Sequence, residues 1–200
     1  HFLTAPPYHW AQVADGLPHC ITQAMFFGPA EGLRLTVNDL VLFATARTMA
    51  RHPEANATFD WDEIRQYARV DLGVAVDTDA GLVVPVVRGC DRLSVAEIDA
   101  EIRRLAAGAR AGSLQPDELR DSTFTVTSAG RLGGLFVTPL INHPEVAILG
   151  LHRIGPRAVV RDGEVVARRM GNVSVTFDHR VVDGARAGAF CVDVIRRLEV

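Results

Sequence analysis

The alternation of apolar and polar residues near the C-terminal end predicts a strand followed by a helix. Residues 173–177 alternate valine and phenylalanine with serine and threonine, a period of two that is typical of a half-buried strand ending at Asp178. From Ala187 to Leu198 the apolar residues recur at spacings of three and four, which predicts an amphipathic helix. The turn between them carries His179 and Asp183, so both side chains are held between two regular elements.

Two further helices are predicted from capping-box patterns. The Thr-Val-Asn-Asp run at 36–39 opens a helix over 36–51, and the Ser-Val-Ala-Glu run at 94–97 opens another over 94–111. The first should end at His52-Pro53, because a residue before proline avoids helical backbone angles. The second should end at Gly112.

Short β-branched runs predict the remaining strands, with turns at 77–81 and 161–164. These runs are 59–61, 70–76, 82–87, 123–127 and 146–151. In the fourth run, threonines 123, 125 and 127 should share one face and Phe124 and Val126 the other. Strands outnumber long helices and several form hairpins, so we predict an α/β two-layer sandwich, a mixed β-sheet with helices packed on it.

Composition limits the classes of function. Apolar residues make up 48% and charged residues 22% of 200 residues, as in an ordinary globular domain, and the net charge of −3 gives no electrostatic reason to expect nucleic acid or anionic membrane as a partner. No apolar run reaches the roughly 18 residues of a membrane span. The three cysteines never form a CxxC pair, so we expect no disulfide framework, no metal site and a cytoplasmic location.

Every one of the 21 basic residues is arginine. A P-loop lysine, a Schiff-base lysine and a lysine carrying lipoate or biotin are therefore excluded from these 200 residues. Any acyl carrier that takes part must lie on a separate domain or protein.

The stretch Asp178-His179-Arg180-Val181-Val182-Asp183-Gly184 resembles the DHRxxDG motif of the acyltransferase core subunits of 2-oxo acid dehydrogenase complexes. It is more distantly similar to the HHxxxDG motif of chloramphenicol acetyltransferase and of peptide-synthetase condensation domains. The resemblance runs from about Leu33 to Leu198 and includes the phrases TVNDLVLFATARTMARHPEANATF and DLGVAVDTDAGLVVPVVRG. It implies a chloramphenicol acetyltransferase-like subunit that forms trimers, with active sites between neighbouring subunits and a catalytic domain at 33–200. Residues 1–32 would be a divergent part of the same domain, since the family's basic helix has no counterpart there.

The same resemblance assigns catalytic roles to three residues. His179 would be the general base that deprotonates a thiol, for which an imidazole is suited because it is available unprotonated near neutral pH. Thr127, in the phrase FTVTSAG, would donate a hydrogen bond to the oxyanion of the tetrahedral intermediate. Asp183 would support the histidine loop by pairing with an arginine from the N-terminal region, although residues 1–33 contain no arginine.

Simpler interpretations stand beside each role. His179 would otherwise be a turn histidine, Thr127 an ordinary strand residue with Ser128 as the competing hydroxyl, and Asp183 the N-cap of the last helix. Two less favoured alternatives are a metal bound by Asp178, His179 and Asp183, and a nucleophilic Cys191. For coenzyme A we name Ser128, Arg131 and Arg88 as candidate binding residues, because guanidinium groups bind phosphate well.

The sequence therefore predicts a CoA-dependent acyltransferase that moves an acyl group between a dihydrolipoamide-type thiol and CoA. The expected partners are acyl-CoA, a thiol acyl carrier and two further copies of the chain, with a larger cage as a possible assembly. A catalytically inactive trimeric scaffold and an acyl-CoA-dependent O- or N-acyltransferase with a small-molecule acceptor are the alternatives.

Overall fold

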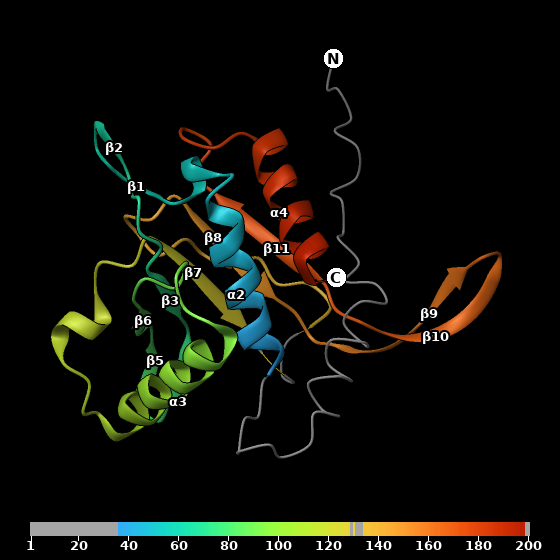
Figure 1. Cartoon of the computed structure of the whole chain (residues 1–200), viewed down its shortest axis with the longest axis horizontal. Coiled ribbons are helices and arrows are strands. Elements are labelled where there is room, and N and C mark those ends of the chain that lie inside the picture. The colour runs from blue at the N-terminus through green and yellow to red at the C-terminus, as the bar shows by residue number, and fades with distance from the viewer. Residues whose placement is uncertain (1–35, 129, 131–133, 199–200) are drawn as a thin grey trace.

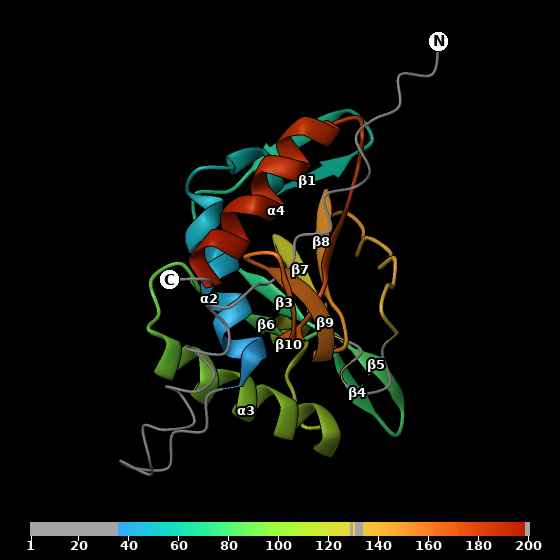
Figure 2. The same ribbon diagram turned by 90° about the vertical axis from the view of Figure 1, so that its right-hand side faces the viewer.

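A five-stranded mixed sheet with three helices on one face forms the centre of the molecule (Figures 1 and 2). The computed structural model describes residues 36–128, 130 and 134–198, so the predictions for residues 1–32 lie outside the described part. The strand order is β11 (Val173–Phe177), β8 (Ala147–Leu151), β7 (Phe124–Ser128), β3 (Leu72–Val74) and β6 (Val86–Val87). β7 runs parallel to β3 and β8, while β11 and β6 are antiparallel to their neighbours. The predicted mixed sheet with helices packed on it is confirmed.

The three α-helices among the described residues are α2 (Val37–Met49), α3 (Val95–Ala111) and α4 (Gly184–Leu198). Both predicted capping boxes are present, at Thr36 and at Ser94. Gly112 ends α3 in the left-handed conformation, φ 64°, which glycine adopts without a steric penalty. None of the helices in the described part of the chain is long and apolar enough to cross a membrane.

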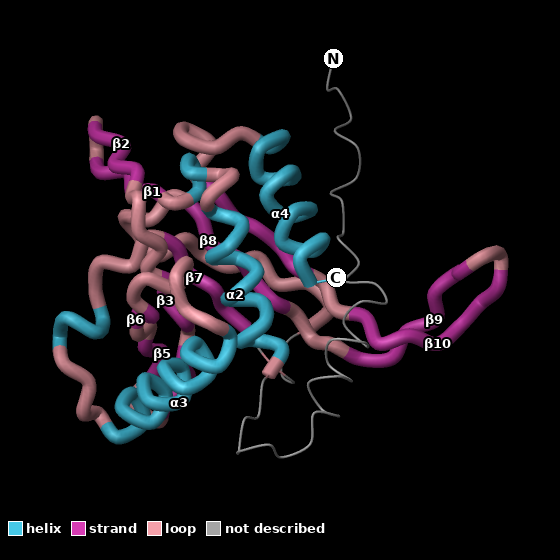
Figure 3. Tube along the Cα trace, in the orientation of Figure 1, coloured by secondary structure: helices cyan, strands magenta, loops and turns pink. Residues whose placement is uncertain are grey.

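Three hairpins extend from this body; Figure 3 shows β1–β2 and β9–β10, and Figure 2 shows β4–β5. They pair β1 (Ala57–Asp60) with β2 (Glu63–Gln66), β4 (Val76–Thr78) with β5 (Gly81–Val83), and β9 (Gly155–Arg161) with β10 (Glu164–Met170). Two short 3₁₀ helices, Pro53–Ala55 and Pro116–Leu119, complete the described elements. The predicted pair of strands at 70–76 and 82–87 is therefore divided, since its outer half forms β4–β5 and its inner half joins the central sheet as β3 and β6.

The core lies between the sheet and the helices. Alternate residues of β7 and β8, among them Phe124, Val126 and Leu149, belong to one buried apolar cluster with residues of α2 and α4. Phe124 packs against Phe190 of α4 with ring centroids 5.5 Å apart. The intervening residues point to the far face, where small and hydroxyl-bearing side chains dominate: Gly73, Thr125, Thr127, Gly150, Ser174 and Thr176.

Candidate active site

His179 lies at the tip of a tight turn immediately after β11. The turn is closed at its base by Asp178, whose N–H donates to the carbonyl of Val146 at 2.7 Å and whose carbonyl accepts from the N–H groups of Val181 and Val182. Val182 is 2% exposed and anchors the far side of the turn in the core. The His179 ring itself is exposed and lies 5.7 Å from the Phe177 ring. The imidazole is thus exposed while the backbone of its turn is held by hydrogen bonds, as a positioned base requires.

Arg180 braces this turn from outside. Its guanidinium donates to both carboxylate oxygens of Asp178, the shortest distance being 2.6 Å, and these hydrogen bonds lower the pKa of the Asp178 carboxyl. The same guanidinium stacks over the Phe59 ring of β1, 4.1 Å from its centroid. The turn is therefore tied to the β1–β2 hairpin as well as to its own strand.

Asp183 is the N-cap residue of α4. Its Oδ1 accepts from the N–H of Arg186 at 2.9 Å, and its Oδ2 lies 3.6 Å from the Arg186 guanidinium. This is the geometry that the simpler interpretation predicted for Asp183. The cap holds the start of α4, which directly follows the histidine turn. The predicted pairing of Asp183 with an arginine of the N-terminal region stays a prediction.

Thr127 and Ser128 end β7 and point to opposite faces of the sheet. The Ser128 hydroxyl accepts from the N–H of Gly130 at 3.3 Å. Thr127 faces away from the helices and is half-buried, and no hydrogen bond among the described residues uses its hydroxyl. Thr127 therefore carries a hydroxyl that is available as a donor on this face.

Within one chain, His179 and Thr127 lie at opposite ends of the sheet. Thr127 is level with Gly150 of β8, and Gly150 is level with Ser174 of β11. Because β11 runs antiparallel to β8 and β7, the five residues that follow Ser174, up to His179, lead away from Thr127. They cover about 15 Å along the strand direction, and Thr127 lies two strand spacings, about 10 Å, to the side. The two side chains do not meet in a single copy of the chain.

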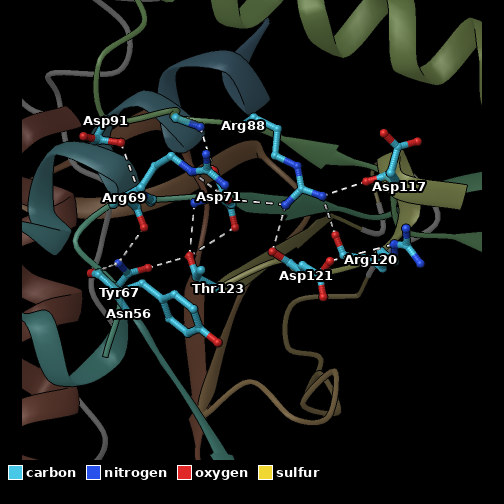
Figure 4. A network of polar contacts seen from close by, with 12 residues as sticks. Asn56, Tyr67, Arg69, Asp71, Arg88, Asp91, Asp117, Arg120, Asp121 and Thr123 are labelled. Atoms are coloured by element: carbon cyan, nitrogen blue, oxygen red, sulfur yellow. Dashed lines mark hydrogen bonds and ion pairs between the residues drawn. The ribbon is translucent and has the colours of Figure 1, made fainter. Parts of the chain in front are cut away.

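Arg88 is engaged in a structural network (Figure 4). Its guanidinium donates to the carbonyls of Asp117, Arg120 and Asp121, at 2.6 to 2.9 Å, and to the carboxylate of buried Asp71 at 3.3 Å. These contacts join the loop before β7 to the strand β3 and leave few donors for a phosphate. They favour a structural role for Arg88, and its binding of CoA stays a prediction. Arg131 lies outside the described residues.

A second polar network, on the far face of the sheet, was not predicted from the sequence. It contains His152 and Asn172, which are 2% and 3% exposed, together with Ser174 and Arg157. Beside it lies a hollow of about 430 Å³ lined by Leu135, Arg153, Ile154, Gly155, Pro156 and Arg157. The sequence carries one signal for this network. His152 directly follows the predicted strand 146–151, and Asn172 directly precedes the predicted strand 173–177, so two polar residues stand at strand ends that should be buried.

The described cysteines are not reactive thiols. Burial raises the pKa of Cys90 to about 12 and that of Cys191 to about 11. A thiol that is protonated at neutral pH is a poor nucleophile. The less favoured interpretation of Cys191 as a nucleophile therefore has no support from its surroundings.

Comparison with curated proteins places this chain among acyltransferases. The dihydrolipoyllysine-residue acetyltransferase component of the pyruvate dehydrogenase complex of Bacillus subtilis is 46% identical over 159 residues, which are 78% of this chain and 36% of the relative. The dihydrolipoyllysine-residue succinyltransferase component of the 2-oxoglutarate dehydrogenase complex of Haemophilus influenzae is 39% identical over 173 residues, 86% of this chain and 42% of the relative. The chain thus spans about two fifths or less of the length of these relatives.

Solved structures agree in fold. A probable dihydrolipoamide acetyltransferase from Listeria monocytogenes superposes with a TM-score of 0.87 at 33% identity, covering 94% of this chain and 81% of that one. The dihydrolipoamide acetyltransferase of Azotobacter vinelandii, studied for the role of a serine, a histidine and an asparagine in its catalytic mechanism, gives 0.79 at 34% identity, covering 91% and 73%. A chloramphenicol acetyltransferase gives 0.55 at 16% identity, covering 88% and 82%, which confirms the predicted fold class.

A family model described as 2-oxoacid dehydrogenases acyltransferase (catalytic domain) matches residues 25–200. The model covers the strand that carries Thr127, the turn that carries His179 and the helix that Asp183 caps. The chain belongs to the family of acyltransferase catalytic domains of the 2-oxoacid dehydrogenases.

Proposed function

We propose that this chain transfers an acyl group between a dihydrolipoyl thiol and coenzyme A, at a site made of His179 from one copy and Thr127 from a neighbouring copy. The observation that carries the proposal is a match in spacing. The serine and histidine named for the Azotobacter enzyme are 52 residues apart, and its histidine and asparagine are four apart. Thr127 and His179 are also 52 apart, and His179 and Asp183 four apart. A hydroxyl-bearing residue, a histidine and a third polar residue (asparagine there, Asp183 here) thus recur in the same order and at the same spacings.

The reaction needs no covalent intermediate on the protein. The His179 imidazole removes the proton of the attacking thiol, and the new carbon–sulfur bond forms as the thiolate adds to the thioester carbonyl. The Thr127 hydroxyl donates a hydrogen bond to the resulting oxyanion. The tetrahedral intermediate collapses when the original carbon–sulfur bond breaks, and the imidazolium returns the proton to the departing thiolate.

Two copies are needed because the two groups lie at opposite ends of one subunit. A heterologous interface, in which different patches of two subunits meet, brings one end of a sheet against the other end of its neighbour's sheet and closes into a ring. The exposed apolar side chains of Leu135, Phe136, Val137 and Leu140, on the segment beside Thr127, support an interface at this end. We propose a homotrimer, as the family resemblance implies, and its further assembly into a cage stays a prediction.

The acyl carrier and CoA come from outside these residues. Since the chain contains no lysine, a lipoyl group on lysine must be supplied by another domain or protein. We further propose that the hollow lined by Arg153 and Arg157 receives the phosphates of CoA, because both guanidinium groups lie just beyond β8, near the end of the sheet that carries Thr127. Ser128 and Arg131 stay predicted CoA-binding residues, and the cytoplasmic location likewise stays a prediction.

Acyl exchange between acyl-CoA and dihydrolipoamide tests the function. The purified protein, assayed with both acetyl-CoA and succinyl-CoA, should catalyse exchange, and His179→Ala should reduce kcat by about 10²- to 10⁴-fold. Ser113→Ala, an exposed serine beyond the end of α3, serves as the control and should leave the rate unchanged. A wild-type protein that assembles but exchanges no acyl group with either substrate would refute the proposal and favour the scaffold alternative.

A further inference from the structure

We infer that His152 and Ser174 are positioning residues that hold the segment Leu135–Pro139 beside Thr127 on the far face of the sheet. This inference rests on the proposed function for the role of Thr127. The segment runs along β11 and β8 and ends where Pro139 meets Gly150, the residue of β8 that is level with Thr127. The end of the segment therefore lies over the strand position next to Thr127.

Two side chains of the β11 region pin the segment by its backbone carbonyls. The Asn172 amide donates to the carbonyl of Leu135 at 2.8 Å, and the Ser174 hydroxyl donates to the carbonyl of Val137 at 3.1 Å. Asn172 and Ser174 each form a hydrogen bond with a residue that follows β8 in the sequence. Arg157 donates to Asn172 at 3.2 Å, and His152 contacts Ser174 at 2.9 Å.

The direction of these hydrogen bonds follows from the chemistry of the groups. A carbonyl oxygen can only accept, so the single hydrogen of the Ser174 hydroxyl goes to Val137 and Ser174 accepts from Nε2 of His152. His152 therefore carries its proton on Nε2. Its Nδ1 is buried with no hydrogen-bond partner among the described residues, and a ring that is 2% exposed cannot turn to water to replace its bond to Ser174. The role of His152 is thus fixed as a donor to Ser174.

Gly150 shows how closely the segment is seated. A Cβ atom on Gly150 would lie 2.9 Å from Ser174 Oγ and 3.3 Å from Pro139 Cγ, so any larger residue would displace either the pin or the segment. Gly150 is paired with Thr127 on one side and with Ser174 on the other. The candidate oxyanion donor and the serine that binds the segment are thus two strands apart at the same level of the sheet. Loss of the Ser174 hydrogen bond should leave the hydroxyl of Thr127 intact but displace the segment Leu135–Pro139, beside which the acyl donor must lie.

The experiment combines hydrogen exchange of residues 134–140, followed by mass spectrometry, with acyl-transfer kinetics. In His152→Ala and Ser174→Ala we expect exchange of this segment to accelerate about tenfold and KM for acyl-CoA to rise about tenfold, with kcat changed less than about twofold. His152→Gln keeps an N–H donor near the position of Nε2 and should restore both quantities. Gly150→Ala should reproduce the defect with His152 intact, and Ser113→Ala should behave as wild type.

Unchanged exchange and unchanged KM in the folded alanine variants would overturn the inference. So would a His152→Gln variant as impaired as His152→Ala, because packing of the ring, and not its hydrogen bond, would then be responsible. Failure of the proposed function gives a different result. The wild-type protein would then transfer no acyl group, while hydrogen exchange of residues 134–140 would still show whether His152 and Ser174 hold the segment.

Discussion

Mixing two inactive variants tests whether the active site takes its residues from two copies of the chain. The first variant, His179→Ala, lacks the base, and the second, Thr127→Val, lacks the hydroxyl but keeps the shape of the side chain. If each site combines His179 of one copy with Thr127 of the next, a mixed oligomer contains some sites in which both residues are present. Neither variant alone contains any.

The expected recovery follows from the strand register. Thr127 and His179 of one chain are separated by about 15 Å along the sheet and about 10 Å across it, so no rearrangement of side chains joins them within a subunit. In an equal and random mixture, a site is complete when the copy giving the histidine is of the second kind and its neighbour is of the first kind. This happens at about a quarter of all sites in an unselected mixture of closed rings, and at about a third of the sites in trimers selected to carry both variants. Since loss of an oxyanion donor costs about 10²- to 10³-fold in kcat, the mixture should exceed the better parent by about 25-fold or more.

The assay is acyl exchange by oligomers that are reassembled from separately tagged variants and purified through both tags. Each variant refolded alone is the control for reassembly, and wild type carried through the same steps defines full activity. An equal mixture that stays at the level of its parents, although both tags are present in each oligomer, would show that His179 and Thr127 do not form a shared site.

Four further outcomes are expected. Thr127→Ser should keep most of the activity because it keeps the hydroxyl, whereas Thr127→Val should lower kcat by about 10²- to 10³-fold, as measured by initial rates. Asp183→Ala should lower the free energy of unfolding by about 1 kcal/mol in urea titrations through loss of the α4 cap, while Asp183→Asn keeps the cap and the stability. Arg88→Ala should cost about 2 kcal/mol of stability yet leave KM for CoA unchanged, and a raised KM would restore its predicted role as a CoA ligand. Burial lowers the pKa of His152 from its usual 6.5, so the unfolded chain binds more protons than the folded chain below about pH 6.5. The free energy of unfolding should therefore fall as the pH is lowered. Urea titrations at pH 5 to 7 should show a smaller fall in His152→Gln.

The elements were predictable because their signals are local. The capping boxes at Thr36 and Ser94, the Asp-Gly turn at 162–163 and the alternation at 173–177 each depend on residues within four positions of one another, and the structure contains all of them. The turn residue Asp162 has φ 49°, as the predicted hairpin requires. Asp183 was likewise predictable as a cap, since a cap is defined by its own helix.

The polar contacts that join distant segments were not predictable. Arg88 was chosen as a phosphate ligand because arginine suits phosphate, but its surroundings are made by a loop some 30 residues later in the chain. Asn172 likewise donates to Leu135, in a segment that carries no periodic signal, and His152 reaches that segment only through Ser174. No local pattern connects these residues with 135–139. Side chains that act across such distances are recognised only when the pairing of strands is known.

Strand direction is what separates the two proposed catalytic groups. Both 123–127 and 173–177 are followed by a polar residue and a predicted loop or turn, and the hydrophobic pattern would be the same whether the two strands ran parallel or antiparallel. Had β11 run parallel to β7, His179 and Thr127 would lie at the same end of the sheet, and a single subunit could hold both groups of the proposed site. The antiparallel pairing of β11 with β8 places them at opposite ends of the sheet, so the subunit presents the proposed base at one end and the proposed hydroxyl donor at the other. The proposed mechanism therefore requires assembly, and it predicts that a variant that folds but remains monomeric is inactive even with His179 and Thr127 in place.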